Sequence, residues 1–222
     1  MRTTIATFIS AFIFFSCATA PAEQNNEENT PDKTKKENSV SNTSFSDGKY
    51  IVNGELSTCK WLGTEITTKT HNGSLNIYKG SAMVINNKVA HGFIAMDMNS
   101  IEVEDLSGAA KESLTGHLKS EDFFGVDKYP FAQLKLESVK TKDGKSYAGG
   151  RLNIRGIDNP ISFPVVVTQD GNQLIFDGDM TFDRSQYDVK FRSGSFPDLF
   201  PDLGDKLIND EIVISFHIVA ES

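Results

Sequence analysis

The sequence is short of the residues from which most enzyme and metal sites are built. Its 222 residues include two cysteines, four histidines and one tryptophan. Two cysteines cannot supply a disulfide framework or a zinc site made of cysteine alone. The histidines form no HExxH pattern, and neither a GxSxG motif nor a glycine-rich phosphate loop is present. These absences argue against a hydrolase and offer no candidate metal ligands.

Positive charge is also in short supply. Lysine and arginine number 22 against 30 aspartates and glutamates, which gives a formal net charge of −8. A protein with this balance is repelled by the phosphates of nucleic acids and by anionic lipid head groups. We therefore expect no nucleic-acid partner and no purely electrostatic adhesion to a membrane.

Long hydrophobic runs are confined to the N-terminus. After Met1-Arg2, the run from Ile5 to Phe15 has the length of a signal-peptide hydrophobic region and is too short to span a bilayer. The sequence therefore predicts a signal peptide over residues 1–16 and an exported protein.

Two processing sites compete after this run. Ala18-Thr19-Ala20 fits ordinary secretory cleavage, but Pro21 would then be the first mature residue. The stretch from Phe14 to Cys17 is similar to a lipobox, so cleavage before Cys17 would leave that cysteine lipidated. Several acyl chains suffice for stable anchoring. We favour this second alternative, a protein anchored in the bacterial envelope, either facing the periplasm or associated with the outer membrane.

The composition changes again after the signal peptide. Residues 17–47 are rich in Glu, Asn, Thr, Lys and Ser, with Phe45 as the one aromatic residue, which is typical of a disordered tether. Residues 48–222 are long enough for one domain with a sizeable core. If Cys17 carries lipid, Cys59 is the remaining thiol and is expected to pack as a small hydrophobic residue.

Apolar and polar residues alternate through the domain. This period of two runs through Phe93–Met98, Gln133–Glu137, Arg151–Arg155 and Glu211–Val219. Further strands are predicted over Tyr50–Val52, Cys59–Trp61, Ser74–Tyr78, Ala82–Ile85, Ile161–Val167 and Leu174–Phe182. Turn residues separate them at Asn72-Gly73, Asn86-Asn87, Asp143-Gly144, Asp158-Asn159-Pro160 and Asp170-Gly171. The pattern predicts an all-β protein with an antiparallel barrel or sandwich.

One insertion, near residues 106–125, breaks the alternation. Leu106, Ala110, Leu114 and Leu118 recur every fourth residue, which predicts a helix between two strands.

A second short helix is predicted directly afterwards. Ser120 is a good N-cap, and Glu121 and Asp122 suit a first helical turn. Phe123 and Phe124 would then lie on a helical turn at the rim of a barrel, where a lid or pocket mouth is expected.

The run from Gly116 to Phe124, GHLKSEDFF, followed by Lys128-Tyr129-Pro130, resembles the signature of the YceI-like family of polyisoprenoid-binding, lipocalin-like proteins. Other stretches match that family's pattern in the same order between about Tyr50 and Ala220. They are Lys60-Trp61 to Gly73, Met96 to Ile101, Gly150 to Gly156, and Phe182-Asp183-Arg184 with Tyr187. The lipoprotein head and the opening VNGELSTCKWLG depart from the usual family pattern.

The resemblance implies an extended eight-stranded antiparallel β-barrel around an apolar channel that holds a long isoprenoid lipid or a quinone. A non-enzymatic carrier of a polyprenol or quinone, without a cofactor, is therefore the expected function. Each methylene-sized group of such a chain gains about 0.8 kcal/mol on burial. The predicted channel and mouth residues are Trp61, Ile94, Met96, Met98, Leu118, Phe123, Phe124, Leu134, Leu136, Leu152, Ile154, Phe163, Phe176, Met180, Phe182 and Phe216.

Polar residues near the predicted mouth are candidates for contacts to a head group. Asp183-Arg184 with Asp188 suits a structural ion-pair cluster at a strand bend. Alternatively, Arg184 could hold a diphosphate, with help from Lys119 or Lys128.

His117 is a further head-group candidate. The plainer interpretation, for His71 as well, is a neutral imidazole bonded to the backbone at the end of a strand or helix. The proline-interrupted run from Phe196 to Leu203 could form a second rim loop or could pack on the outside of the barrel.

Other functions compete with the carrier. The barrel could span the outer membrane, because alternation does not say which face is apolar. It could also be a structural envelope barrel with a filled core, or an envelope enzyme that uses His71 or His117. Pairing of two barrels into a homodimer is left open.

Overall fold

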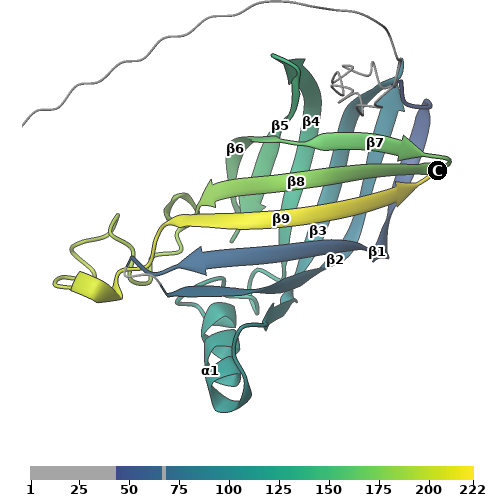
Figure 1. Ribbon diagram of the computed structural model, residues 1–222. Coiled ribbons are helices and arrows are strands. Elements are labelled where there is room, and N and C mark those ends of the chain that lie inside the picture. Colours follow the sequence, from purple (N-terminus) through teal and green to yellow (C-terminus); the bar gives the residue numbers. More distant parts are fainter. Residues whose placement is uncertain (1–43, 67–68) are drawn as a thin grey trace, which may run out of the picture. The chain divides into compact units, whose positions relative to one another are not determined.

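The computed structural model describes residues 44–66 and 69–222 and consists of β-strands with one α-helix and two short 3-10 helices (Figure 1). The strands are β1 (Gly48–Thr64), β2 (Thr70–Ile85), β3 (Lys88–Val103), β4 (Phe131–Lys142), β5 (Lys145–Ile154), β6 (Ile157–Pro164), β7 (Val166–Asp170), β8 (Gln173–Asp183) and β9 (Glu211–Glu221). The helices are α1 (Gly108–Lys119), η1 (Arg184–Tyr187) and η2 (Gly204–Lys206). The predicted signal peptide, Cys17 and nearly all of the predicted tether lie outside the described residues.

All nine strands belong to one antiparallel sheet in the order β6-β5-β4-β3-β2-β1-β9-β8-β7. The two edge strands, β6 and β7, are consecutive in the chain and are separated by Val165 alone. Because β6 pairs with β5 and β7 pairs with β8, the chain steps from one edge of the sheet to the other within one residue. The sheet must therefore curl round on itself, and Figure 1 shows β7, β8 and β9 crossing in front of β3, β4 and β5.

The two edges meet through side chains. No strand pairing joins β6 to β7 or β8 in the described part of the chain, so the sheet stays open along this seam. The Phe163 ring of β6 instead packs edge-on against Phe216 of β9, with 5.7 Å between ring centroids. Asn159 also donates a hydrogen bond across the seam to the carbonyl of Gln186.

The predicted fold class is confirmed. The chain forms an all-β, antiparallel, lipocalin-like sheet with a helical insertion between β3 and β4. The structure has nine strands rather than eight, because the strand predicted over residues 161–167 is divided at Val165. Proline at position 164 lacks the N–H that a continuous ladder would need.

Several predicted turns are confirmed as hairpin connections. Asn86 and Asn87 both have positive φ angles, of 52° and 61°, and Asp143-Gly144 has 51° and 74°. Two successive residues with positive φ form the tight turn whose twist matches that of the flanking strands.

Two predicted turns are wrong. Gly73 lies inside β2, where an added Cβ would stand 1.8 Å from the Glu102 carbonyl oxygen. This glycine therefore permits close approach of β3 rather than a turn. Pro160 lies inside β6, an edge strand in which a missing N–H is tolerated. The turn itself falls at Arg155-Gly156, with φ angles of 53° and 78°.

The predicted first helix is present as α1, but the second is absent. Ser120 ends α1 rather than beginning a new helix, because its N–H donates to the carbonyls of Gly116 and His117. Residues 121–124 then form a turn.

Two clusters of buried apolar side chains form the interior. The larger one follows the inner faces of β3, β4, β5 and β8 and reaches α1 and the turn after it. The smaller one closes the far end around Tyr50, Val84 and Leu174, each at most 1% exposed.

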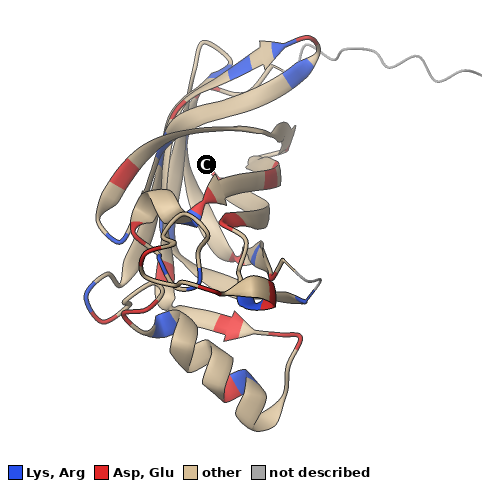
Figure 2. Ribbon diagram, turned by 90° about the vertical axis from the view of Figure 1, so that its left-hand side faces the viewer, with Lys and Arg blue, Asp and Glu red and all other residues tan. Residues whose placement is uncertain are grey.

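Most charged side chains of the described residues lie on the outer surface, and the buried Arg184 is an exception. Figure 2 shows acidic and basic positions distributed over strands, hairpin ends, loops and α1. None of the helices in the described ranges has the length and hydrophobicity of a membrane-spanning segment.

Gly73→Ala tests the close approach of β2 and β3. The new methyl group would meet a backbone carbonyl that has no room to move, so we expect a loss of about 1–3 kcal/mol or more in the free energy of unfolding. Gly116→Ala is the control, because this position in α1 faces open space. It should gain about 0.5–1 kcal/mol. Urea denaturation followed by circular dichroism measures both, and equal stabilities would contradict the packing described.

Candidate functional site

The interior of the curled sheet contains a cavity of about 370 Å³ with an overwhelmingly apolar lining. This volume lies within the range of small-molecule sites. Every residue predicted for the channel and mouth lines it, from Trp61 on β1 to Phe216 on β9. Whether these side chains contact a ligand stays a prediction, but the sequence pattern located the side chains that share this space.

Cross-strand register explains why the lining is continuous. Leu134 on β4 stands opposite Ile94 on β3 and opposite Leu152 on β5. On the other wall, Met180 of β8 stands opposite Ile214 of β9. Since side chains of a strand alternate between faces, each such pair repeats two residues on and builds an apolar stripe.

One end of the cavity is closed by the smaller buried cluster. Val52, Leu136 and Val139 line the cavity and pack against that cluster, which fills the end beyond them. The Tyr50 hydroxyl donates to the Ser46 carbonyl at 2.9 Å, which satisfies its polar group at this apolar end.

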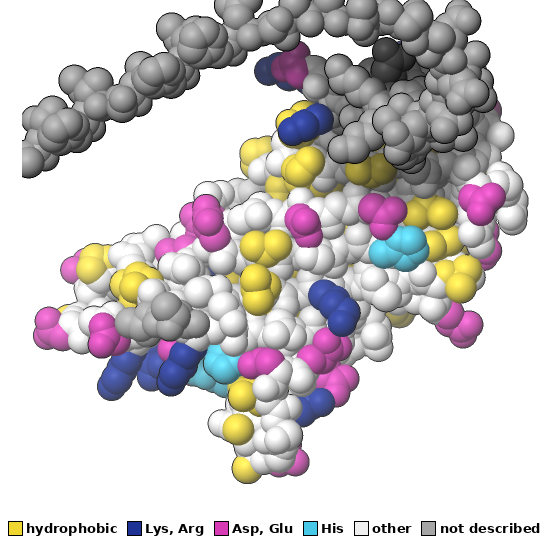
Figure 3. All heavy atoms as spheres, in the orientation of Figure 1, with side chains coloured by type: hydrophobic (Ala, Val, Ile, Leu, Met, Phe, Trp, Pro, Cys, Tyr) yellow, Lys and Arg dark blue, Asp and Glu magenta, His cyan; other side chains and the backbone are white. Residues whose placement is uncertain are grey.

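The opposite end is formed by irregular chain and carries the polar groups. Leu114, His117 and Leu118 come from α1, and Phe191, Arg192 and Ile208 come from residues 184–210, the segment between β8 and β9, here called the 184–210 loop. Glu65 and His71, at the ends of β1 and β2, complete this mouth. In Figure 3 a histidine and several Lys or Arg side chains gather between α1 and the 184–210 loop.

In the turn after α1, the acidic side chains are exposed to water and the neighbouring Phe123 is buried. The carboxylates of Glu121 and Asp122 are 69% and 63% exposed, whereas Phe123 is 7% exposed. Arg155 holds this geometry, because its Nη1 donates to the carbonyls of Glu121 and Phe123. Charged and aromatic residues can therefore stand side by side at the mouth.

Arg184 has a structural role that the sequence predicted only in part. Its side chain is fully buried, and four of its N–H groups donate to the carbonyls of Val189, Phe191, Ile208 and Asn209. The fifth N–H lies towards Asp210, whose carboxylate oxygen is 3.2 Å from Nη2 in an ion pair without hydrogen-bond geometry.

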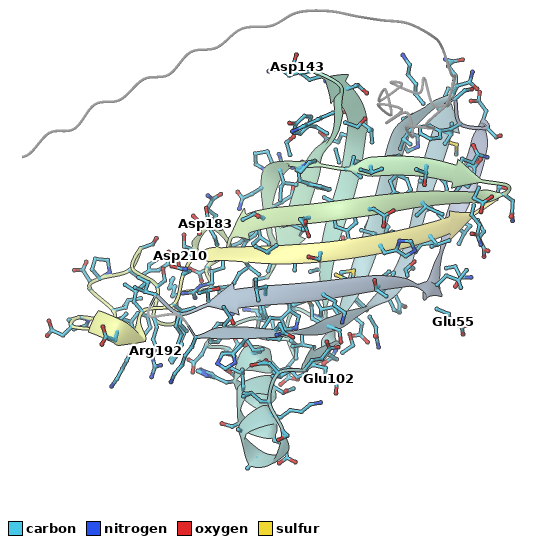
Figure 4. The ribbon with its side chains drawn as sticks, in the orientation of Figure 1. Glu55, Glu102, Asp143, Asp183, Arg192 and Asp210 are labelled. Carbon is cyan, nitrogen blue, oxygen red and sulfur yellow. The ribbon has the colours of Figure 1, made fainter. Side chains whose placement is uncertain are left out.

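A guanidinium has five N–H donors, so this arrangement leaves Arg184 none for a head group. Burial lowers the pKa of Arg184, and the charges of Asp210 and Asp183 partly offset that effect. The ion-pair partner is Asp210 rather than the predicted Asp188, which instead pairs with Lys190 at 2.7 Å. Figure 4 labels Asp183 and Asp210 near each other, where β8 ends and β9 begins.

The remaining cations of the predicted diphosphate clamp lie elsewhere. Lys119 does not line the cavity but faces a shallow groove between α1 and β3. The Lys128 ammonium lies 5.1 Å from the centroid of the Tyr129 ring. Among the described residues, the arginine that lines the mouth without a carboxylate partner is Arg192, which stacks on Phe191.

Both predicted histidines line the cavity, but their partners are carboxylates rather than backbone groups. His71 Nδ1 lies 2.8 Å from Asp105, and His117 Nε2 lies 3.3 Å from Asp122. Burial would raise the pKa of Asp105, but hydrogen bonds from the Asn72 N–H and from His71 outweigh it and leave that pKa below its usual range. Within residues 44–66 and 69–222, no three His, Cys, Asp or Glu side chains gather to hold a metal ion.

Two alternatives were open for the run from Phe196 to Leu203, and the structure does not support the one that made it a second rim of the cavity. Phe196, Leu199 and Phe200 do not line the cavity, and Leu199 is 57% exposed. Phe191 takes their place, with Phe200 packed behind it at 5.8 Å between centroids. Sequence periodicity could not single out Phe191, because the 184–210 loop has no regular repeat.

Cys59 is buried in the cavity wall. Burial raises the pKa of its thiol to about 12, so the thiol stays protonated at neutral pH. Because the thiolate is the reactive form, this cysteine behaves as a small apolar residue, as predicted.

Arg184→Gln tests the structural role of the buried guanidinium. The substitution leaves backbone carbonyls and Asp210 without their partner, so we expect a loss of about 3–5 kcal/mol in unfolding free energy. Arg151→Gln is the matched control, because its ion pair with Asp158 is exposed to solvent and should contribute little to stability. Chemical denaturation measures both losses. Similar values for the two variants would refute the assignment.

Comparisons with known proteins agree with this architecture. BcnA from Burkholderia cenocepacia superposes with a TM-score of 0.60 at 22% identity, covering 76% of this chain and 98% of its own. A polyisoprenoid-binding domain from Saccharophagus degradans, implicated in plant cell wall breakdown, gives 0.55 at 12% identity, covering 78% and 98%. A comparison with curated proteins gave no sequence match. The family model of the YceI-like domain matches residues 50–220, and the chain therefore belongs to the YceI-like family.

Proposed function

We propose that this protein is a non-enzymatic carrier of an isoprenoid-type lipid, either a polyprenol or a quinone. The observation that carries the proposal is the apolar cavity, lined along its length by aliphatic, methionine and aromatic side chains and polar at its mouth. An apolar chain fits the closed end, and a more polar head group fits the mouth.

The energetics of burial support a long flexible tail. Each methylene-sized group contributes about 0.8 kcal/mol when it leaves water, so a few isoprene units suffice for firm binding. Met96, Met98 and Met180 in the wall can adapt to an irregular chain.

The open interior also favours a carrier over a structural barrel with a filled core. Protein cores are packed with few voids larger than a water molecule. A cavity of about 370 Å³ departs from that rule and needs an occupant to recover the lost contacts.

A relative gives the proposal independent support. The domain from Saccharophagus degradans, which has the same fold, is described as polyisoprenoid-binding. The carboxylate partners of His71 and His117 favour a positioning role for these imidazoles over catalysis, because neither pair includes a serine, threonine, cysteine or lysine for the imidazole to activate.

Export and anchoring complete the proposal. A signal peptide over residues 1–16, a lipidated Cys17 and a tether over residues 17–47 would hold the domain in the bacterial envelope. The length of such a tether would let the mouth reach a bilayer and exchange its lipid.

Met180→Trp tests whether the cavity is the binding site. Met180 is buried in the cavity wall, so an indole there should occupy the space of the tail and weaken binding of all-trans-retinol, a fluorescent isoprenoid, at least tenfold. Thr181→Trp is the matched control, because the neighbouring residue on β8 is exposed and should leave binding unchanged. Equal binding by the two folded variants would place the lipid outside this cavity.

Cys17→Ser tests the anchor. In bacteria producing the full chain, an alkyne analogue of palmitate should label the natural protein and place it in the membrane fraction. The serine variant has no thiol to accept a diacylglyceryl group, so it should lose both the label and the membrane association. If neither protein is labelled and both are found in the soluble fraction, cleavage after Ala20 and a free periplasmic domain are favoured instead.

A further inference from the structure

We propose that Phe191 is the gate of the cavity and that the buried Arg184 is the residue that positions it. This inference rests on the proposed function, because it concerns how the lipid passes the mouth. It concerns the rate of passage and not the affinity of the occupied cavity.

Three rings from three different segments meet at the mouth. His117 lies on α1, Phe123 on the turn after it and Phe191 on the 184–210 loop, and all three line the cavity. The centroid distances are 4.4 Å for His117–Phe191, 5.1 Å for His117–Phe123 and 5.5 Å for Phe123–Phe191. A closed triangle of contacts bridges the helix side and the loop side of the mouth.

Arg184 fixes the backbone that carries the gate ring. Nη1 donates to the carbonyl of Val189 at 3.1 Å and to that of Phe191 itself at 2.9 Å. Nε and Nη2 tie the same guanidinium to Asn209 and Ile208 at the other end of the loop. One fully buried side chain therefore joins both ends of the 184–210 loop and fixes the position of Phe191 at the mouth of the cavity.

The next residue shows that the backbone is held in an unusual conformation. Arg192 has a φ of 50°, in the left-handed region that residues other than Gly, Asn and Asp seldom adopt. Its carbonyl accepts a hydrogen bond from the Ile208 N–H at 2.9 Å, which stabilises this turn. Arg192 itself stacks on the Phe191 ring, with 5.1 Å between guanidinium carbon and centroid, and is labelled at this end of the molecule in Figure 4.

The position of Phe191 distinguishes a gate from a core residue. Its ring is only partly buried, and it lies across the mouth from His117, whose side chain is 33% exposed. Phe200 packs behind it and does not line the cavity. Phe191 therefore lies in the mouth and not in the wall of the sheet, and rotation of its ring away from His117 and Phe123 would open the cavity.

A gate has a kinetic signature that a structural ring lacks. Removing the Phe191 ring should lower the barrier in both directions, so the rates of loading and release should rise together, by about tenfold, while Kd changes little. If Phe191 were only core packing, its removal would raise Kd and lower stability without accelerating loading.

The experiment is stopped-flow quenching of Trp61, the sole tryptophan, by decylubiquinone in the full chain. Trp61 lines the cavity, so its fluorescence reports occupancy. The variants are Phe191→Ala and, as the control, Phe200→Ala, whose ring packs behind the gate and does not line the cavity. Arg184→Lys keeps the charge but cannot reach all four carbonyls. Under conditions in which this variant is folded, its loading and release rates should rise as they do in Phe191→Ala.

The expected result is parallel acceleration of both rates in Phe191→Ala and near-natural rates in Phe200→Ala. Natural loading rates in Phe191→Ala, with normal equilibrium quenching, would overturn the gate and leave the carrier function standing. If decylubiquinone and all-trans-retinol both fail to bind the natural chain at equilibrium, the proposed function itself falls.

Discussion

The chain passes from β6 to β7 through the single residue Val165. Two consecutive segments occupy opposite edges of one sheet, so the sheet has to curl until those edges meet. Curling turns one face of every strand inwards, and the two-residue period supplies that face with apolar side chains. The enclosed space is wider than the side chains fill, and the cavity is the result.

The mouth follows from the same constraint at the end where the strands stop. There α1, the turn after it and the 184–210 loop cover the opening, and irregular chain needs partners for its backbone groups. The side chains of Arg155 and Arg184 are such partners. Arg155 donates to carbonyls of the turn after α1, and Arg184 donates to carbonyls of the 184–210 loop. The two arginines therefore fix the shape of the mouth, because they donate hydrogen bonds to its backbone carbonyls and not to a ligand.

The inward-facing residues of the strands were predictable, and the loop chemistry was not. Met96, Leu134 and Phe216 were identified by alternation, since a strand offers only two faces. Phe191 was missed because it belongs to a loop whose path is set by hydrogen bonds distant in sequence. Arg184 was linked to Asp188 because they are neighbours in the chain, whereas the fold brings Asp210 to it. Ser120 has the residue type of a helix N-cap, but in the structure it is the C-cap of α1.

The proposed function requires the curled sheet to enclose a binding cavity and not merely a core that is incompletely filled. Native mass spectrometry of the full chain, isolated from a bacterial envelope and followed by solvent extraction, tests it most directly. We expect a species heavier than the polypeptide, whose extra mass is released by the solvent as an isoprenoid. A species with the mass of the polypeptide alone, which also takes up neither added polyprenol nor quinone, would contradict the claim.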